Sequence, residues 1–277
     1  KIFMKLSLSC RVAEVSNNKE KSFLPIKSLI KLAVLNGFEG ISLRPSVVST
    51  NSSIDDINNL RSIFNFYNIK VSMVTSNIHL AKNDNFSSDN LRNIKPCLDL
   101  ANKLGTSLVR IMIKNKEDIY FAKKALDEAL ERGIILTQQT HWGTMAETVQ
   151  DTLSLVKEIS RDNFGITYEP ANLMACGSKY DVNALKTLLP YIVNFYFQNI
   201  ILDQDGNHEF NTFKNGKIKV SYVPLDDHNG ISIIPLLNFL KENKYNGWFT
   251  VHQPLLKGQN INLAVKEAAN LFMPYKS

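Results

Sequence analysis

The sequence predicts a single (β/α)8 barrel domain spanning residues 1–277. Short apolar runs typical of strands alternate with longer stretches of helical periodicity along the whole chain, a pattern typical of a parallel sheet with helical crossovers. Eight strand-then-helix units in 277 residues favour a closed barrel over an open doubly wound sheet. Neither GxGxxG nor GxxxxGK follows any predicted strand, so we expect no nucleotide cofactor.

The predicted elements follow one another without a linker rich in proline, glycine or serine. Ser53 has the residue type of a helix N-cap, and Gly105 and Gly133 stand where two predicted helices end. The strands are expected at residues 5–9, 40–44, 69–75, 107–113, 134–139, 164–168, 191–200 and 247–251. The helices are expected at residues 28–36, 53–67, 88–104, 118–132, 144–160, 182–189, 233–242 and 262–272.

One stretch, residues 201–223, does not fit the alternation of strands and helices. It is polar and contains the turn-forming run Asp203-Gln-Asp-Gly206. We therefore expect a hairpin-like insertion in the loop that follows the seventh strand.

Composition excludes several classes of protein. The net charge is +6, but the lysines are dispersed and form no basic stripe, so we expect no nucleic-acid partner. Three cysteines without a close pair exclude a disulfide framework and a CxxC zinc site, which favours a cytoplasmic location. No apolar run approaches the roughly 20 residues that span a bilayer, so we expect no membrane partner.

The chemistry of a (β/α)8 barrel lies at the carboxyl ends of its strands. Three of the five histidines of this chain, His79, His141 and His252, fall at such ends. The other polar residues at these positions are Ser9, Arg11, Arg44, Asn77, Arg110, Lys114, Gln139, Glu169, Asn172, Tyr196, Gln198, Asn199 and Gln253.

Five segments carry a resemblance to a known family. Residues 36–43 are NGFEGISL, 133–141 are GIILTQQTH, 165–172 are GITYEPAN, 195–199 are FYFQN and 245–252 are YNGWFTVH. In this order and spacing they resemble the motifs of the xylose isomerase-like sugar phosphate isomerase/epimerase superfamily, a family of TIM barrels, over essentially the whole chain. The seventh-strand segment looks most like the 3-dehydroshikimate dehydratase branch.

The resemblance implies a divalent metal at the barrel mouth, which would chelate vicinal substrate oxygens and stabilise an enediolate. The matching ligand positions here are Gln139, Glu169, Tyr196 and His252, and none of them is the family's usual residue. Together they carry about one negative charge, whereas the usual ligand set carries about three. A bound Mn, Mg, Zn or Co ion is therefore in doubt, and both proton-shuttling glutamates of the family are absent.

What remains could still remove a proton from carbon with one base. The candidate catalytic residues are Glu169, His252 and His141. Arg110 or Lys114 would hold an anionic group or a developing oxyanion. The full set of candidate substrate-binding residues is Arg110, Lys114, Asn172, Gln198 and Trp142.

Two kinds of function follow from these residues. The first is an isomerase, epimerase or dehydratase acting on a small sugar or hydroxy acid, with or without a carboxylate or phosphate. The second is a non-catalytic carbohydrate-binding or regulatory relative that has lost the metal. Cleavage of abasic DNA, found in a sister branch, needs a multi-zinc cluster that these five histidines cannot supply. The resemblance also implies a dimer or tetramer, although no surface pattern in the sequence supports either.

Overall fold

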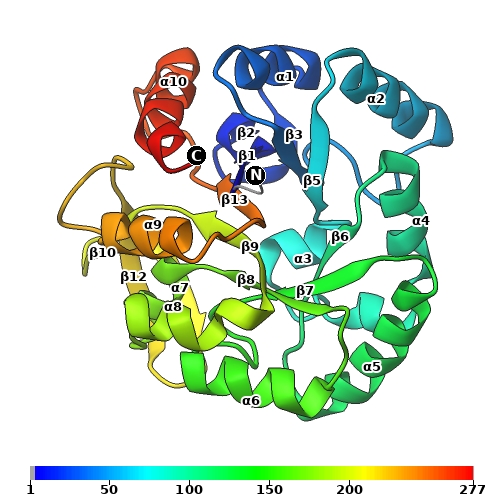
Figure 1. Cartoon of the computed structure of the whole chain (residues 1–277), viewed down its shortest axis with the longest axis vertical. Coiled ribbons are helices and arrows are strands. Elements are labelled where there is room, and N and C mark those ends of the chain that lie inside the picture. Colours follow the sequence, from blue (N-terminus) through cyan, green and yellow to red (C-terminus); the bar gives the residue numbers. More distant parts are fainter. Residues whose placement is uncertain (1–3, 277) are drawn as a thin grey trace.

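Eight parallel strands close into a barrel in the computed structural model, which describes residues 4–276. Neighbouring strands pair in the order β1-β13-β9-β8-β7-β6-β5-β4, and β4 pairs again with β1. The predicted barrel is thus confirmed (Figure 1). The strands are β1 (Lys5–Ser9), β4 (Gly40–Leu43), β5 (Lys70–Val74), β6 (Leu108–Ile111), β7 (Ile135–Gln139), β8 (Phe164–Tyr168), β9 (Ile192–Phe197) and β13 (Trp248–Val251).

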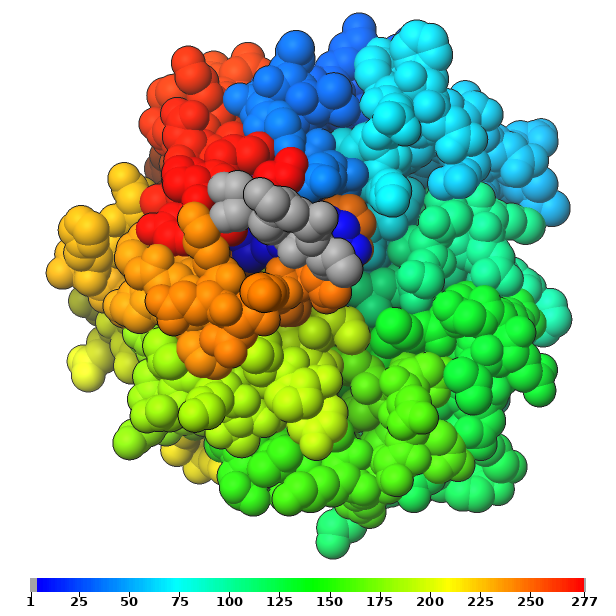
Figure 2. Space-filling model, in the orientation of Figure 1, coloured from blue at the N-terminus to red at the C-terminus, as the bar shows by residue number. Residues whose placement is uncertain are grey.

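Helices surround the barrel and cover the outer side of the strands, as Figure 1 shows. The first and last of them, α1 and α10, contact each other where the barrel closes, and Figure 2 shows them side by side in blue and red. The predicted cap Ser53 accepts a hydrogen bond from the Asp56 N–H at the start of α2. The main helices are α1 (Ile26–Leu35), α2 (Ile54–Phe66), α4 (Lys95–Leu104), α5 (Lys116–Leu130), α6 (Val149–Ile159), α8 (Val182–Leu188), α9 (Ile233–Glu242) and α10 (Ile261–Phe272).

Two helix predictions are wrong at their starts. The expected helix 88–104 consists of a 3-10 turn at Asp89–Arg92 followed by α4, because Pro96 is accommodated only in the first turn of a helix. The expected helix 144–160 begins instead at Val149, after Thr148, whose side chain accepts from the Asp151 N–H. The residues before Thr148 form a turn beside the barrel mouth.

Short elements that the sequence pattern does not reveal lie in the loops after the strands. A hairpin of β2 (Glu14–Val15) and β3 (Asn18–Ser22) follows the 3-10 turn Cys10–Ala13, in the loop between β1 and α1. The strand β3 was missed because it is polar throughout and has no apolar alternation. Two short helices, α3 (Ile78–Lys82) and α7 (Pro170–Ala175), follow β5 and β8.

The irregular stretch after the seventh strand is a small antiparallel sheet. Its strands are β10 (Ile200–Leu202), β11 (His208–Thr212) and β12 (Gly216–Tyr222), in the order β10-β12-β11. Glu147 ties this sheet to the turn before α6, since its carboxylate accepts from the N–H groups of Gly143 (2.7 Å) and Phe213 (2.6 Å). The stacked rings of Trp142 and Phe210 add an apolar contact between the same two segments.

No helix in residues 4–276 combines the length and the hydropathy that a membrane crossing requires.

Candidate functional site

Glu169 lies directly after β8 at the barrel mouth and is fully buried. Gln139, the last residue of β7, donates its side-chain amide to Glu169 Oε2, whereas Glu169 Oε1 has no hydrogen-bond partner among the described residues. Burial raises the pKa of Glu169 to about 7, although Arg11 and Arg110 act in the opposite direction. A carboxyl group with this pKa can both release and accept a proton near neutral pH.

Tyr196 is on β9, the strand next to that of Glu169, and its ring packs against His252, which follows β13. Their rings are stacked, with centroids 4.0 Å apart and planes 12° from parallel. His252 Nδ1 is 3.0 Å from Ser9 Oγ, and the Tyr196 hydroxyl is 2.8 Å from Ser42 Oγ. Burial, together with the nearby arginines, holds the pKa of His252 well below its usual value, so its imidazole is neutral.

His141 follows β7 and is also neutral, because burial and the charge of Arg110 lower its pKa well below the usual value. Its Nδ1 is 2.8 Å from the Trp142 carbonyl oxygen. The Asn83 side-chain nitrogen, a donor, is 3.2 Å from the same Nδ1, so these two contacts require opposite tautomers. In either tautomer the neutral ring has a lone pair on one nitrogen, which is what a general base needs.

Arg110, in β6, is a buried cation that forms no ion pair within 4 Å with the described residues. Its side chain is 2% exposed, and its Nε has no hydrogen-bond partner among the described residues. Ion pairs of arginine in the described chain are formed by Arg44, Arg92, Arg132 and Arg161 only. Burial lowers the pKa of Arg110 to about 10. Burying an unpaired guanidinium costs free energy, and an anion that pairs with it would offset this cost.

The other predicted binding residues differ in what they contact. Lys114 donates from Nζ to Asn83 Oδ1 (3.0 Å) and to the Asp84 carbonyl (3.0 Å), so it holds the loop after α3. Gln198 accepts at Oε1 from Arg11 Nη1 (2.6 Å). Asn172 donates to the Thr140 carbonyl (3.0 Å) and is buried, with its Oδ1 unpartnered among residues 4–276.

Three residues of the first loop join the site, and two of them were not among the candidates. Arg11 reaches from the 3-10 turn to Gln198, to the His252 carbonyl (3.3 Å) and to the Tyr222 hydroxyl (2.8 Å). Glu14 accepts from Arg44 Nε (2.6 Å) in a pair that is almost completely buried. The third residue is Lys19, on β3. Their signal in the sequence is that they all follow the first strand, on the side where barrels carry their sites.

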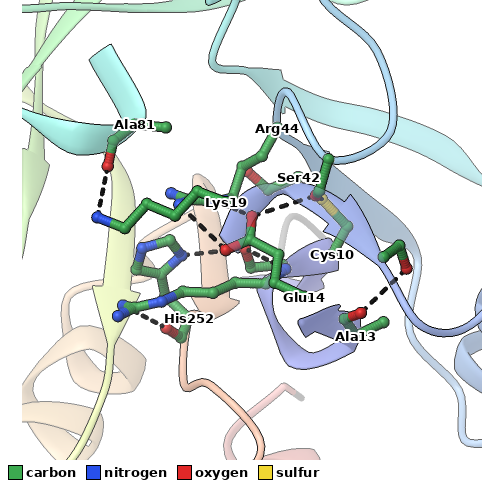
Figure 3. Close-up of polar contacts among 12 residues, drawn as sticks. Cys10, Ala13, Glu14, Lys19, Ser42, Arg44, Ala81 and His252 are labelled. Carbon is green, nitrogen blue, oxygen red and sulfur yellow. Dashed lines mark hydrogen bonds and ion pairs between the residues drawn. The ribbon is translucent and has the colours of Figure 1, made fainter. Parts of the chain in front are cut away.

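Lys19 extends from β3 across the site, and Figure 3 shows its side chain passing between Arg44 and His252 toward α3. Its Nζ donates to the Ala81 carbonyl at 2.8 Å. Burial and the charges of Arg44, Arg11 and Arg110 lower the pKa of Lys19 to about 7, while Glu14 has the opposite effect.

The residues at the mouth do not fit a divalent metal. Glu169 is the one carboxylate at the four family ligand positions, and its pKa is raised rather than lowered. The Tyr196 hydroxyl is engaged by Ser42, and residues 4–276 contain no cluster of three or more histidine, cysteine, aspartate or glutamate side chains able to hold an ion. Cations occupy the surroundings instead: Arg11, Lys19, Arg44 and Arg110.

The closed parallel barrel with polar residues at its mouth defines the class of protein, a TIM barrel. Comparison of the sequence with family models then identifies the family. A family model described as "Xylose isomerase-like TIM barrel" matches residues 30–273, so the chain belongs to this family. A 3-dehydroshikimate dehydratase of Bacillus anthracis is 23% identical over 217 residues, which are 71% of this chain and 75% of that protein.

Solved structures share the fold at low sequence identity. The probable 3-DHS dehydratase of Bacillus anthracis superposes with a TM-score of 0.73 at 19% identity, covering 98% of this chain and 99% of that one. A D-psicose 3-epimerase, described in the presence of D-fructose, gives a TM-score of 0.70 at 13% identity with 98% of each chain covered. A Mycobacterium smegmatis protein of this fold, in complex with magnesium, gives 0.69 at 14%, covering 99% of this chain and 96% of that one.

Proposed function

We propose that this protein is an enzyme of the isomerase/epimerase or dehydratase type that moves a proton on a small, polyhydroxylated, anionic substrate without a divalent metal. The observation that carries the proposal is Glu169, a fully buried carboxyl group with a pKa of about 7 and one unpartnered oxygen at the barrel mouth. A carboxyl group in such surroundings is poorly stabilised when it is charged, and sites that transfer protons are where this arrangement is found.

In this proposal Glu169 removes the proton from the carbon next to a substrate carbonyl. Arg110 holds the anionic group of the substrate beside this base, because its guanidinium is buried and its Nε has no hydrogen-bond partner among residues 4–276. His141 and His252, both neutral, are the groups available to accept or return a second proton. Gln139 orients the Glu169 carboxyl group.

The names of the relatives support proton transfer without choosing between its outcomes. Loss of water from a hydroxyketone and epimerisation beside a carbonyl both begin with the removal of a proton from carbon. The similar chains include a 3-dehydroshikimate dehydratase and a D-psicose 3-epimerase. Which reaction follows depends on where the second proton goes: to the opposite face of the same carbon for epimerisation, or to the departing hydroxyl for loss of water.

Hydrogen exchange into deuterated water tests the proposal. A panel of ketoses and cyclic hydroxy-keto acids is incubated with the protein, and loss of carbon-bound hydrogen is followed by NMR. We expect exchange with at least one anionic member, loss of exchange in Glu169→Gln, and no loss in Glu209→Gln, a substitution of an exposed glutamate on β11. Exchange should persist after chelation with EDTA. Exchange that appears only on addition of Mn, Mg, Zn or Co would contradict the proposal.

The alternative is a carbohydrate-binding or regulatory relative without catalysis. The substitution at all four ligand positions favours it, since the residues usual in the family are absent. It predicts that a panel member binds, and shifts the melting temperature, without any hydrogen exchange by the wild-type protein.

A further inference from the structure

The hairpin formed by β2 and β3, which are not barrel strands, brings Lys19 to the barrel mouth. Strand β3 contacts α3. Two polar links join them: Lys19 donates to the Ala81 carbonyl, and Lys82 lies 3.8 Å from the Glu20 carboxylate. In Figure 3 the Lys19 side chain extends past His252 to Ala81. The loops after β1 and β5 are thus joined by the Lys19 side chain and by the exposed Lys82–Glu20 pair.

The charges around Lys19 do not balance. Arg11, Arg44 and Arg110 all act on it, and Glu14 is the carboxylate that opposes them. Glu14 is already committed, because it accepts from Arg44 Nε at 2.6 Å, from Arg44 Nη2 at 3.3 Å and from Ser46 Oγ at 3.1 Å. Arg110 has no ion-pair partner in residues 4–276, and neither has Lys19.

We propose that Lys19 and Arg110 form a subsite for the anionic group of the substrate, a carboxylate or a phosphate, and that Lys19 exchanges the Ala81 carbonyl for this group on binding. The proposal deepens the proposed function and rests on it for the identity of the site, although anion binding does not require catalysis. It makes Lys19 a specificity-determining residue that the family's ligand positions do not include.

The exchange is favourable because the two partners of Lys19 differ in charge. The Ala81 carbonyl is neutral, whereas a carboxylate or phosphate oxygen forms a charge-assisted hydrogen bond, which is about twice as strong as a neutral one. The bound anion would also satisfy the unpartnered guanidinium of Arg110. Recognition of the anionic group therefore moves the Lys19 ammonium from the Ala81 carbonyl to the substrate, and a neutral sugar cannot cause this exchange.

Protons provide a readout that a structural role of Lys19 would not produce. With its pKa near 7, Lys19 is largely neutral at pH 8, and an adjacent anion would raise that pKa. Binding at pH 8 should therefore take up protons, whereas at pH 6 Lys19 is already charged. The groups that face Lys19 and share this field are Arg11, Glu14, Arg44, Arg110, His141, His208 and His252.

Isothermal titration calorimetry in two buffers of different ionisation enthalpy, at pH 6 and pH 8, measures affinity and proton uptake together. The probes are quinate, a hydroxylated carboxylate, ribose 5-phosphate, and ribose as the neutral control. Lys19→Met is compared with Lys21→Met, a substitution of an exposed lysine on the same strand. Quinate and ribose 5-phosphate separate the two sources of the anionic group.

We expect one of the anionic probes to bind at least about tenfold more tightly than ribose, the equivalent of one charge-assisted hydrogen bond. Lys19→Met should remove this preference and most of the proton uptake at pH 8, and Lys21→Met should leave both unchanged. Equal binding of ribose, or unchanged uptake in Lys19→Met, would overturn the subsite. Anion binding that depends on Lys19, without hydrogen exchange in any substrate, would instead refute the proposed catalysis alone.

Discussion

The imidazole of His252 stacks on the phenol ring of Tyr196, with the two centroids 4.0 Å apart. These residues occupy two positions at which the family's metal ligands are expected. His252, after β13, forms a hydrogen bond with Ser9 of the neighbouring strand β1, and Tyr196 of β9 forms one with Ser42 of β4, which is not a neighbouring strand. At these two positions the rings therefore pack in the interior of the barrel, and their polar atoms are satisfied by serine hydroxyls. We therefore expect the stacked pair to contribute to the free energy of unfolding.

Tyr196→Phe keeps the ring and removes the hydrogen bond to Ser42. We expect the free energy of unfolding to fall by about 1 kcal/mol, the usual net contribution of a buried hydrogen bond. Tyr196→Ala also removes the ring and should cost about 3–5 kcal/mol, as large-to-small substitutions in cores do. Urea denaturation of both variants checks the order, and a Tyr196→Phe variant as unstable as Tyr196→Ala would contradict it.

Glu169 makes stability depend on pH in a direction set by its raised pKa. Its folded-state pKa is about 7, against an ordinary value of 4.5, so between these two pH values the folded protein binds more protons than the unfolded chain. Stability must then fall as the pH rises from 4.5 to 7 and stay low above it. Glu169→Gln removes this loss, which amounts to at most about 3 kcal/mol.

The measurement is the difference in free energy of unfolding between Glu169→Gln and wild type from pH 4 to pH 8. It should be near zero at the acid end and favour the variant at neutral pH. Glu209→Gln, on the exposed strand β11, should show no such trend. A variant less stable than wild type at pH 8 would show that the buried carboxyl group is not strained.

Arg110→Met removes a buried guanidinium that has no ion pair, and no hydrogen-bond partner at Nε, among residues 4–276. We expect the variant to be more stable by about 1–3 kcal/mol, the range of the penalty for an unsatisfied buried polar group, and to lose hydrogen exchange. Arg132→Met is the matched comparison, because Arg132 pairs with Asp99 and Glu128 and should lose stability when truncated. Denaturant titration gives the free energy of unfolding of both variants. A decrease in Arg110→Met as large as that in Arg132→Met would show that buried Arg110 does not destabilise the fold.

The Arg44–Glu14 pair should behave in the opposite way. Both side chains are less than a tenth exposed, and the Nε–Oε1 distance is 2.6 Å. Arg44→Met leaves the Glu14 carboxylate buried without its partner, and we expect a loss of about 3–5 kcal/mol. The double variant Arg44→Met/Glu14→Gln should recover most of this loss. A double-mutant cycle that shows no coupling would argue against a desolvated pair.

Glu147 should determine whether the sheet of β10, β11 and β12 stays docked over the mouth. Its carboxylate accepts from the Gly143, Phe213 and Lys214 N–H groups and is buried. Glu147→Ala should speed hydrogen–deuterium exchange in residues 208–222 without changing exchange in the barrel strands. Glu209→Ala, which removes an exposed pair with Lys217, is the control. Unchanged exchange in Glu147→Ala would mean that the Trp142–Phe210 stack is enough to hold the sheet.

The sequence alone determined the barrel, because its information is local. The alternation of short apolar runs and helical stretches depends on residues close in the chain, as does the cap at Ser53. The placement of Glu169 and His252 at strand ends also follows from knowing where each strand stops. The error at Pro96 is also local, because the prediction of a helix over 88–104 ignored that proline is tolerated only in the first turn of a helix.

Only the tertiary structure decided what surrounds those strand ends. Glu14 and Lys19 lie on a polar hairpin without a strand-like pattern, yet the hairpin folds over the mouth and contacts α3. That Arg44 is paired and Arg110 is not depends on which carboxylate reaches each guanidinium across more than 20 positions of sequence. The pKa values of Glu169 and Lys19 follow from burial by segments distant in the chain. Burial and charge are sums over neighbours in space, so the order of residues indicated the fold while the fold determined the chemistry of the site.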